Sequence, residues 1–420
     1  MDRTETLVTT NEPAQVRQLP DNISMESLFG ALFDPTVWDD PYHLYEELRN
    51  RAAVCQLDES VWVLSSHEAV QHALRSPDCS SDERRSTEMQ QLAAESPSEY
   101  DGLGSMMLFM DPPDHTRLRR LVARAFTPRQ VKTIEPRAAQ IVEELLDTIG
   151  PRFDVVSELA HPLAVQIICE LLGVPFSDRD VFAGWGTALA RSVDPGVLRT
   201  PEQERAVDEA SEAFSEYFVD LIEARRKNPG DELLTELIEA EEDGDRLSMD
   251  ELVSVCLLVL VAGYETTVNL VGNGAVALMS HRDQWERLGD ADVDIMLAVN
   301  EFLRYDAPVQ MNIRVATTDM DVAGTAVRAG DSLIPLLAAA NRDPAVFADP
   351  HRLDISRVEN PHLAFGGGIH HCLGAALART EAAAAFAGIR TRYPSLELAD
   401  APVRRPTFTL RGFTSVSVTT

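Results

Sequence analysis

The stretch His362-Leu-Ala-Phe-Gly-Gly-Gly-Ile-His-His-Cys-Leu-Gly374 joins a glycine-rich loop to a single cysteine, Cys372. The run Ala375–Ala385 follows directly and has the strongest helix propensity in the chain. We therefore expect Cys372 to lie at a helix N-terminus, where unpaired N–H groups and the helix dipole favour a thiolate. Three consecutive glycines let the backbone come close to a large flat group.

A thiolate held in this way is a suitable axial ligand for haem iron. Two other interpretations compete with this one. Cys372 could pack as a small hydrophobic side chain, or His370, His371 and Cys372 could bind a metal ion, although adjacent residues rarely all bind one metal. The pattern Phe365-Gly366-x-Gly368-x-His370-x-Cys372-x-Gly374 closely resembles the haem-binding signature of the cytochrome P450 family.

The second motif is Ala262-Gly-Tyr-Glu-Thr-Thr267. Ser248-x-x-Glu251 is a capping box that starts a predicted helix to Ser280, about 45 Å long and apolar on nearly all sides in its first half. A buried carboxylate needs partners, and a threonine can bond back to its own helix. The motif resembles the oxygen-activation motif of the same family, which implies that Thr266 hydrogen-bonds dioxygen and that Glu265 relays protons.

The third motif is Glu301-x-x-Arg304, whose charges share one helix face and can pair. It resembles the Glu-x-x-Arg of the family, which fixes the core below the haem. Arg352, in Asp349-Pro-His-Arg-Leu-Asp354, matches the third member of that structural network.

The two carboxylates of a haem need cations or hydrogen-bond donors. His115 and Arg119 lie at i and i+4 on one predicted helix face. Together with Arg314 and His370 they match family positions that bind the haem propionates. The resemblance implies the following set of cofactor-binding residues: His115, Arg119, Ala262, Arg314, Phe365, Gly368, His370, Cys372 and Gly374.

Composition limits the class of protein. The chain has 420 residues, 45% of them hydrophobic, and a net charge of −31, which argues against nucleic acids and anionic membranes as partners. Five cysteines at irregular spacings imply no disulfide framework and favour a reducing cytoplasm. We expect no leader or anchor at the N-terminus, and the longest apolar run, Val255–Gly263, is too short to span a membrane.

Periodicity and capping signals predict a mainly helical chain with small β-sheets, in keeping with a cytochrome P450-like fold whose long central helix lies over the haem. We expect a mobile segment over residues 1–20, a single haem-thiolate domain over 21–420, and a long loop over 76–105. The predicted helices are 41–51, 66–75, 111–126, 127–150, 157–173, 178–192, 201–227, 231–239, 248–280, 282–289, 293–305 and 373–392. Predicted strands lie at 61–65, 311–318, 320–335 and 406–418.

A basic stretch stands out in this acidic chain. Between His115 and Arg137 there are seven Arg or Lys residues and one acid, Glu135, a net of about +6. This is either a solvated helix face or a docking patch for a small acidic electron donor. We place Arg117, Arg120 and Arg124 in this patch, on the thiolate side of the haem.

The substrate is the least determined part of the prediction. We expect a mostly apolar pocket, with Gln310 and Asn312 available to orient the substrate, and a lid near Ser192–Gly196. The expected lining residues are Met106, Met107, Leu108, Phe109, Leu258, Ala262, Val309, Gln310, Met311, Asn312, Phe413 and Thr414.

The resemblance implies a haem b monooxygenase that inserts one oxygen atom of O2 into a C–H or C=C bond of a mid-sized apolar substrate, by hydroxylation or epoxidation in secondary metabolism. Electrons would come from NAD(P)H through a ferredoxin reductase and a ferredoxin, and the protein would be a cytoplasmic monomer. One alternative is a haem-thiolate enzyme for oxidative coupling or dehydrogenation. The other is a non-enzymatic haem-binding sensor, which has no need of the Glu265-Thr266 pair.

Overall fold

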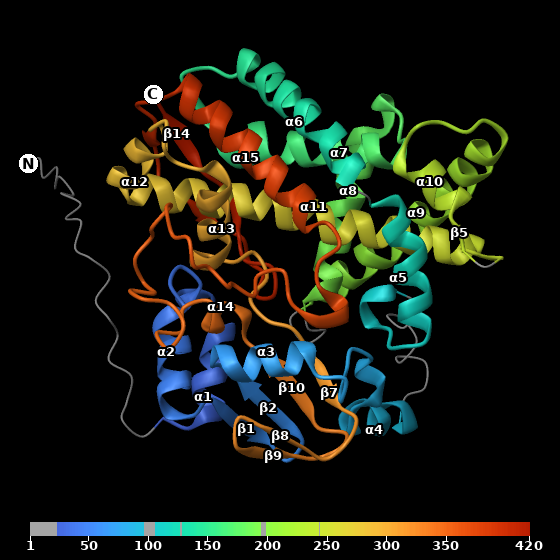
Figure 1. Cartoon of the computed structure of the whole chain (residues 1–420), viewed down its shortest axis with the longest axis vertical. Helices are drawn as coiled ribbons and strands as arrows, with labels where there is room; N and C mark the ends of the chain where they lie inside the picture. The colour runs from blue at the N-terminus through green and yellow to red at the C-terminus, as the bar shows by residue number, and fades with distance from the viewer. Residues whose placement is uncertain (1–22, 96–105, 127, 195–198, 243) are drawn as a thin grey trace, which may run out of the picture.

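Helix α11, Met249–Ser280, crosses the centre of the molecule in this computed structural model (Figure 1). Its N-terminus is the predicted capping box, in which the Ser248 hydroxyl accepts from the Glu251 N–H and the Glu251 carboxylate accepts from the Ser248 N–H. Its 32 residues give a length of about 48 Å at 1.5 Å per residue. Most of its side chains are buried, as the apolar pattern predicted.

The structure describes residues 23–95, 106–126, 128–194, 199–242 and 244–420. The predicted mobile segment 1–20, the Thr127 cap and part of the predicted lid lie outside these ranges. The α-helices are α1 Met25–Gly30, α2 Tyr42–Arg51, α3 His67–Arg75, α4 Thr87–Glu95, α5 Asp114–Ala125, α6 Pro128–Thr148, α7 His161–Leu172, α8 Arg179–Leu189, α9 Pro201–Lys227, α10 Leu233–Glu239, α11, α12 Arg282–Arg287, α13 Ile295–Tyr305, α14 Leu337–Ala340 and α15 Ala375–Arg392.

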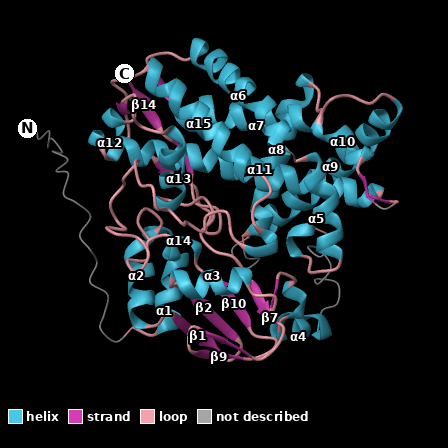
Figure 2. Cartoon of the chain, in the orientation of Figure 1, coloured by secondary structure: helices cyan, strands magenta, loops and turns pink. Residues whose placement is uncertain are grey.

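Helices gather on one side of the molecule and the largest sheet lies on the other (Figure 2). That sheet has the strand order β1-β2-β10-β7-β3, where β1 is Val54–Asp58, β2 Val61–Leu64, β10 Ser332–Pro335, β7 Arg314–Ala316 and β3 Cys79–Ser80. The parallel pair β2–β10 aligns Trp62 with Leu333, and antiparallel pairing then aligns Leu333 with Arg314. This register places Arg314, which was predicted to bind a haem propionate, on an inner strand of the sheet.

Shorter strand pairs complete the β structure. β11 (Glu397–Leu398), β14 (Ser417–Thr419) and β4 (Arg152–Asp154) form a three-stranded sheet, and β12 (Val403–Arg404) pairs with β13 (Phe413–Ser415). The hairpins are β5 (Glu241–Glu242) with β6 (Asp245–Arg246) and β8 (Met320–Val322) with β9 (Thr325–Val327). The predicted fold class, mainly α with small sheets, is confirmed.

One predicted segment was wrong. The expected loop over 76–105 contains strand β3, a 3₁₀ turn at Glu83–Arg85 and helix α4, and its residues 96–105 lie outside the described ranges. Polar surface helices such as α4 carry too weak an apolar stripe to be recognised by periodicity. The helix expected over 157–173 begins with a π-helical turn, Val155–Ala160, that leads into α7.

Two helical passages, Val155–Leu172 and Met249–Ser280, are long and apolar enough to span a membrane by length and composition. The predicted apolar run, Val255–Gly263, therefore covers only part of the apolar length of α11. Both passages are largely buried inside the fold, 67% and 72% respectively, as expected for core helices.

Candidate functional site

The Cys372 loop is held by its own backbone and by α3. The Cys372 N–H donates to the Phe365 carbonyl at 2.9 Å, and Gly374 is the N-cap of α15. Gly368 has φ +63°, and a Cβ there would lie 2.4 Å from the Leu74 carbonyl oxygen. Only glycine fits this close contact between loop and helix.

Cys372 lies three residues before the first residue of α15, in the loop that leads into the helix. Burial raises the pKa of the Cys372 thiol, while the Gly374 N–H and the charges of Arg119 and Arg379 oppose that rise. The predicted position near a helix start is therefore present, with the N–H of the N-cap residue Gly374 acting on the sulfur, and the two arginines are an addition that was not predicted. Within the described residues, no group of three or more His, Cys, Asp or Glu side chains could hold a metal ion, so the three-ligand site considered at Cys372 is not formed.

The four predicted propionate ligands come together from three separate parts of the chain. The rings of His115 on α5 and His370 in the cysteine loop lie 4.1 Å apart. Burial lowers the pKa of His370 to about 3, and the charges of His115, Arg314 and Arg119 add to that effect. Burial also lowers the pKa of His115, with Arg119 contributing in the same direction.

These groups have unused capacity to bind an anion. Both ring nitrogens of His115 and Nε2 of His370 are buried without a hydrogen-bond partner. A neutral imidazole has one N–H donor and one acceptor nitrogen, and buried polar atoms without a partner are expensive unless a ligand satisfies them. Arg314 is buried, and its Nη1 donates to the Asn312 side chain at 2.6 Å and to the Ile313 carbonyl at 2.7 Å, whereas Arg119 donates to the His371 carbonyl at 2.6 Å. The arrangement fits a group that carries carboxylates.

One face of α11 is accessible although the helix is otherwise mostly buried. Leu258, Ala262 and Thr266 repeat at i, i+4 and i+8 and are all exposed or half-buried, so they form one stripe. The Thr266 hydroxyl donates to the Ala262 carbonyl at 2.5 Å. Its oxygen keeps the capacity to accept a further hydrogen bond.

Glu265 does not share this face. Successive helix residues are about 100° apart, and the buried Glu265 carboxylate instead forms an ion pair with Arg405 at 2.6 Å. Burial raises the pKa of Glu265, whereas the charges of Arg405 and Arg191 lower it. The sequence offered no signal for Arg405, which precedes Pro406 in the C-terminal segment. A proton can therefore pass between Glu265 and Thr266 only through a water molecule or after a rotation of the carboxylate.

The Glu301 network has a different third member from the one predicted. Glu301 and Arg304 are fully buried and paired at 2.7 Å. The second guanidinium on Glu301 belongs to Arg357, at 3.2 Å. The Arg352 side chain is exposed, and only its carbonyl takes part by accepting from Arg304 at 3.0 Å. The prediction of Arg352 as a side-chain member was wrong because the turn that follows it brings Arg357 back onto Glu301.

Several predicted substrate contacts point elsewhere. Gln310 is buried, accepts from the Tyr45 hydroxyl at 3.0 Å and donates to the Ala307 carbonyl at 2.6 Å. Met311 belongs to the hydrophobic core formed with α1 and α2. The Asn312 side-chain oxygen is bound by Arg314. Gln310 and Met311 are therefore not available to contact a substrate, which contradicts their prediction. The Asn312 oxygen supports Arg314, while its half-buried amide NH2 keeps the role of Asn312 in substrate orientation a prediction.

Of the two C-terminal lining predictions, the one for Phe413 is wrong because its side chain is buried in the core, and the one for Thr414 stays a prediction. Phe413 is buried against α11 near Gly272, beneath the Arg404 guanidinium at 3.7 Å. Thr414 is exposed and donates to the Val403 carbonyl. Of the remaining predicted residues, Met107 is buried in the core, while Met106, Leu108, Phe109, Leu258 and Val309 retain accessible surface.

The basic stretch on α5 is less open than its composition indicated. Arg117 is paired with Asp245 and Glu251, and Arg137 holds Glu170. Arg120 and Arg124 are exposed, and Arg124 also donates to the Glu241 carbonyl. Of the three residues named for the predicted docking patch, Arg117 is therefore paired with two acids of the same chain.

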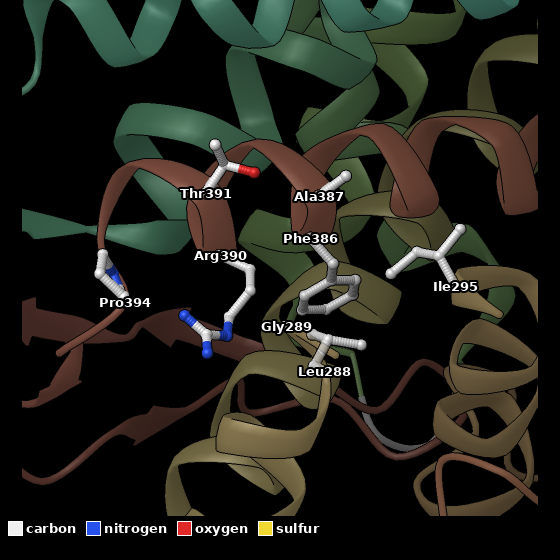
Figure 3. A pocket seen from close by; sticks show the side chains of 8 residues that line it. All are labelled: Leu288, Gly289, Ile295, Phe386, Ala387, Arg390, Thr391 and Pro394. Atoms are coloured by element: carbon white, nitrogen blue, oxygen red, sulfur yellow. The ribbon is translucent and has the colours of Figure 1, made fainter. Parts of the chain in front are cut away.

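A groove of about 380 Å³ lies between α12, α13 and the far end of α15 (Figure 3). Ile295, Phe386 and Arg390 are among its lining residues. No predicted site residue lines it, so it has no part in the site at Cys372.

The family model described as Cytochrome P450 matches residues 27–290 and 296–401 of this chain. The chain belongs to the cytochrome P450 family. Members of this family bind haem b through a cysteine thiolate, which here is Cys372. The orphaned imidazole nitrogens, the two arginines and the accessible face of α11 fit that group, so the implied cofactor agrees with the residues present.

Individual relatives are similar over nearly the whole chain. The Vitamin D(3) 25-hydroxylase of Pseudonocardia autotrophica is 42% identical, covering 92% of this chain and 96% of its own. The 6-deoxyerythronolide B hydroxylase of Saccharopolyspora erythraea is 37% identical over 90% and 96%. The ligand-free crystal structure of Mycobacterium smegmatis CYP164A2 matches with a TM-score of 0.86 and 39% identity, covering 94% of this chain and 100% of that one. These relatives are hydroxylases or cytochromes P450, and this chain is a cytochrome P450 monooxygenase.

Proposed function

We propose that this cytochrome P450 hydroxylates or epoxidises a mid-sized apolar secondary metabolite of polyketide or macrolide type. The observation that carries the proposal is the accessible stripe of α11, whose residues apart from Thr266 are apolar. Both ends of the Gln310 amide are committed to internal bonds, which favours recognition largely by shape. Relatives described as 6-deoxyerythronolide B hydroxylase, PikC of Streptomyces venezuelae and the polyketide biosynthesis protein PksS of Bacillus subtilis support this substrate class.

When bound, the haem supplies the activation of O2 and the transfer of one of its oxygen atoms. In our proposal His115, Arg119, Arg314 and His370 hold the haem carboxylates by charge-assisted hydrogen bonds. Cys372 contributes the thiolate. Glu301, Arg304 and Arg357 keep the adjacent core rigid and take no part in the chemistry.

Proton delivery is assigned to the α11 motif. The Thr266 hydroxyl turns from the Ala262 carbonyl toward the accessible face and donates there. Glu265, held at Arg405, passes protons from the side of the C-terminal segment through water. Burial raises the pKa of Glu265 and the charge of Arg405 opposes that rise, so the balance of the two effects sets when Glu265 gives up a proton.

The redox partners and the setting are also proposed. Like other members of its family, the enzyme receives electrons from a redox partner. We propose that a ferredoxin, reduced by a ferredoxin reductase, supplies them and docks at Arg120 and Arg124 on α5. A cytoplasmic, monomeric enzyme without membrane association is proposed from the net charge of −31 and from the bacterial relatives.

The test is a screen of macrolide and polyketide aglycones for the spectral change that follows displacement of water from the haem, followed by turnover under ¹⁸O2. We expect a binding compound to yield a product that contains one ¹⁸O atom. A product with no label would favour coupling or dehydrogenation, and absence of the spectral change with every aglycone would exclude the substrate class.

A further inference from the structure

Arg379 occupies a fixed position on the second turn of α15, behind the cysteine loop. Its guanidinium carbon lies 4.4 Å from the centre of the Phe365 ring. The carbonyl of that same Phe365 accepts the hydrogen bond from the Cys372 N–H at 2.9 Å. Phe365 therefore contacts both groups: its ring lies against the Arg379 guanidinium, and its carbonyl accepts the hydrogen bond from the backbone of Cys372.

Two further bonds keep the guanidinium in place. Its Nε donates to the Asn300 side-chain oxygen at 2.8 Å, and its Nη1 donates to the Ala375 carbonyl at 3.3 Å. Nδ1 of His362 accepts from the Ala364 N–H at 3.3 Å, so a neutral His362 has its proton on Nε2 and donates to the same Asn300 oxygen at 3.3 Å. Burial lowers the pKa of His362 to about 3, so this ring is neutral and Arg379 is the cation of the cluster.

The positive charge of Arg379 has no carboxylate partner within ion-pair distance in the described part of the chain. Its bonds go to an amide oxygen and a backbone carbonyl, which are neutral. Burial lowers the pKa of Arg379, and the negative charge of Cys372 opposes that effect. A half-buried cation without an acid is unusual, and Cys372 is the group whose negative charge acts on it.

We propose that Arg379 acts through Cys372 as the counter-charge of the thiolate and thereby raises the reduction potential of the haem. The ferric centre gains one electron from the donor and becomes one unit more negative, so a fixed cation beside its ligand favours the reduced form. The proposal rests on Cys372 as the axial ligand. The charge of Arg119 also lowers the pKa of Cys372. Arg119 belongs to the residues predicted to bind the haem carboxylates, however, so its replacement would disturb two interactions with the haem, and Arg379 is the better residue to test.

The experiment is a potentiometric titration of the purified holoenzyme with dithionite and small mediators, without a protein partner. We expect Arg379→Gln to lower the equilibrium constant for reduction about tenfold, which is ~59 mV for a one-electron couple. Arg379→Lys keeps the charge and should retain most of the parent potential. The red-shifted band of the reduced CO complex, measured in each variant, reports whether the thiolate is still bound.

Arg390→Gln is the matched control. Arg390 lies on the same helix about three turns later, where it lines the groove of Figure 3. It also donates to backbone carbonyls and also lies over an aromatic ring, at 5.4 Å from the centre of Trp285. It is not among the groups that shift the pKa of Cys372, so its loss should leave the potential unchanged.

Different results would contradict either the role of Arg379 or the identity of the haem ligand. An unchanged potential in Arg379→Gln with an intact CO band overturns the counter-charge. Loss of the band in both Arg379→Gln and Arg379→Lys shows that Arg379 only packs the loop, which also overturns it. Absence of the band in the parent enzyme would instead contradict Cys372 as the ligand.

Discussion

At the scale of single residues, the two members of the α11 motif have different surroundings. Thr266 faces the accessible side of the helix, and Glu265 is buried against Arg405. Adjacency in sequence suggested a joint role, but adjacent side chains on a helix point in different directions. Their roles can therefore be separated by mutation.

Replacing Thr266 by Ala removes the hydroxyl on the accessible face without changing the haem cluster. We expect haem content and substrate affinity to stay within about twofold of the parent, while coupling of NADPH use to product falls about tenfold because one positioned proton donor is lost. Peroxide release and product yield measure this. Thr266→Ser is the control, and full coupling in Thr266→Ala would remove Thr266 from proton delivery.

Replacing Arg405 by Gln removes the cation that opposes the effect of burial on Glu265. The pKa of Glu265 is already raised by burial, and without Arg405 it should rise further. The limb of the pH profile that requires ionised Glu265 should therefore move to higher pH. Steady-state coupling measured across pH tests this, with Arg405→Lys as the charge-preserving control. If Glu265→Gln retains the same limb, the limb belongs to another group.

At the scale of elements, α13 and the turn after Arg352 form one buried unit. Glu301 is completely buried and accepts from Arg304, from Arg357 and from the Asp354 N–H at 2.9 Å. Spacing within a helix identified the pair at i and i+3. The partner from the coil depends on how the chain turns back, which no periodic pattern encodes.

Arg357 and Arg352 provide a direct comparison of the observed network with the predicted one. Arg357→Ala removes a charged hydrogen bond from buried Glu301 and should lower the free energy of unfolding by about 2 kcal/mol. Arg352→Ala leaves the accepting carbonyl in place and should change it by less than about 0.5 kcal/mol. Chemical denaturation of the holoenzyme measures both. Equal losses in the two variants would contradict the assignment of Arg357.

At the scale of the whole molecule, the acidic chain concentrates exposed positive charge on α5. Pairing of Arg117 with Asp245 and Glu251 reduces that charge, so composition alone overstated it. Arg120 and Arg124 remain exposed. We propose that an acidic electron donor docks at these two exposed residues.

Arg120→Glu combined with Arg124→Glu should slow the first electron transfer from ferredoxin by about tenfold at low salt, and by less at high salt, because screening weakens the attraction. Stopped-flow reduction under CO measures the rate. Arg152→Glu is the control, since Arg152 lies on β4 beside β14, at the other end of the molecule from α5 (Figure 1). An unchanged rate in the double variant would exclude this docking site.

The sequence by itself determined the elements whose signals are local. The capping box at Ser248, the apolar length of α11, the loop before Cys372 and the i, i+3 pair of Glu301 and Arg304 each follow from a few neighbouring residues. The tertiary structure decided which distant groups meet. In the folded chain Arg405 pairs with Glu265, Arg357 pairs with Glu301, and the side chains of Gln310 and Met311 are buried in the core. Such contacts depend on how loops close and how side chains compete for burial, and these are properties of the packed chain.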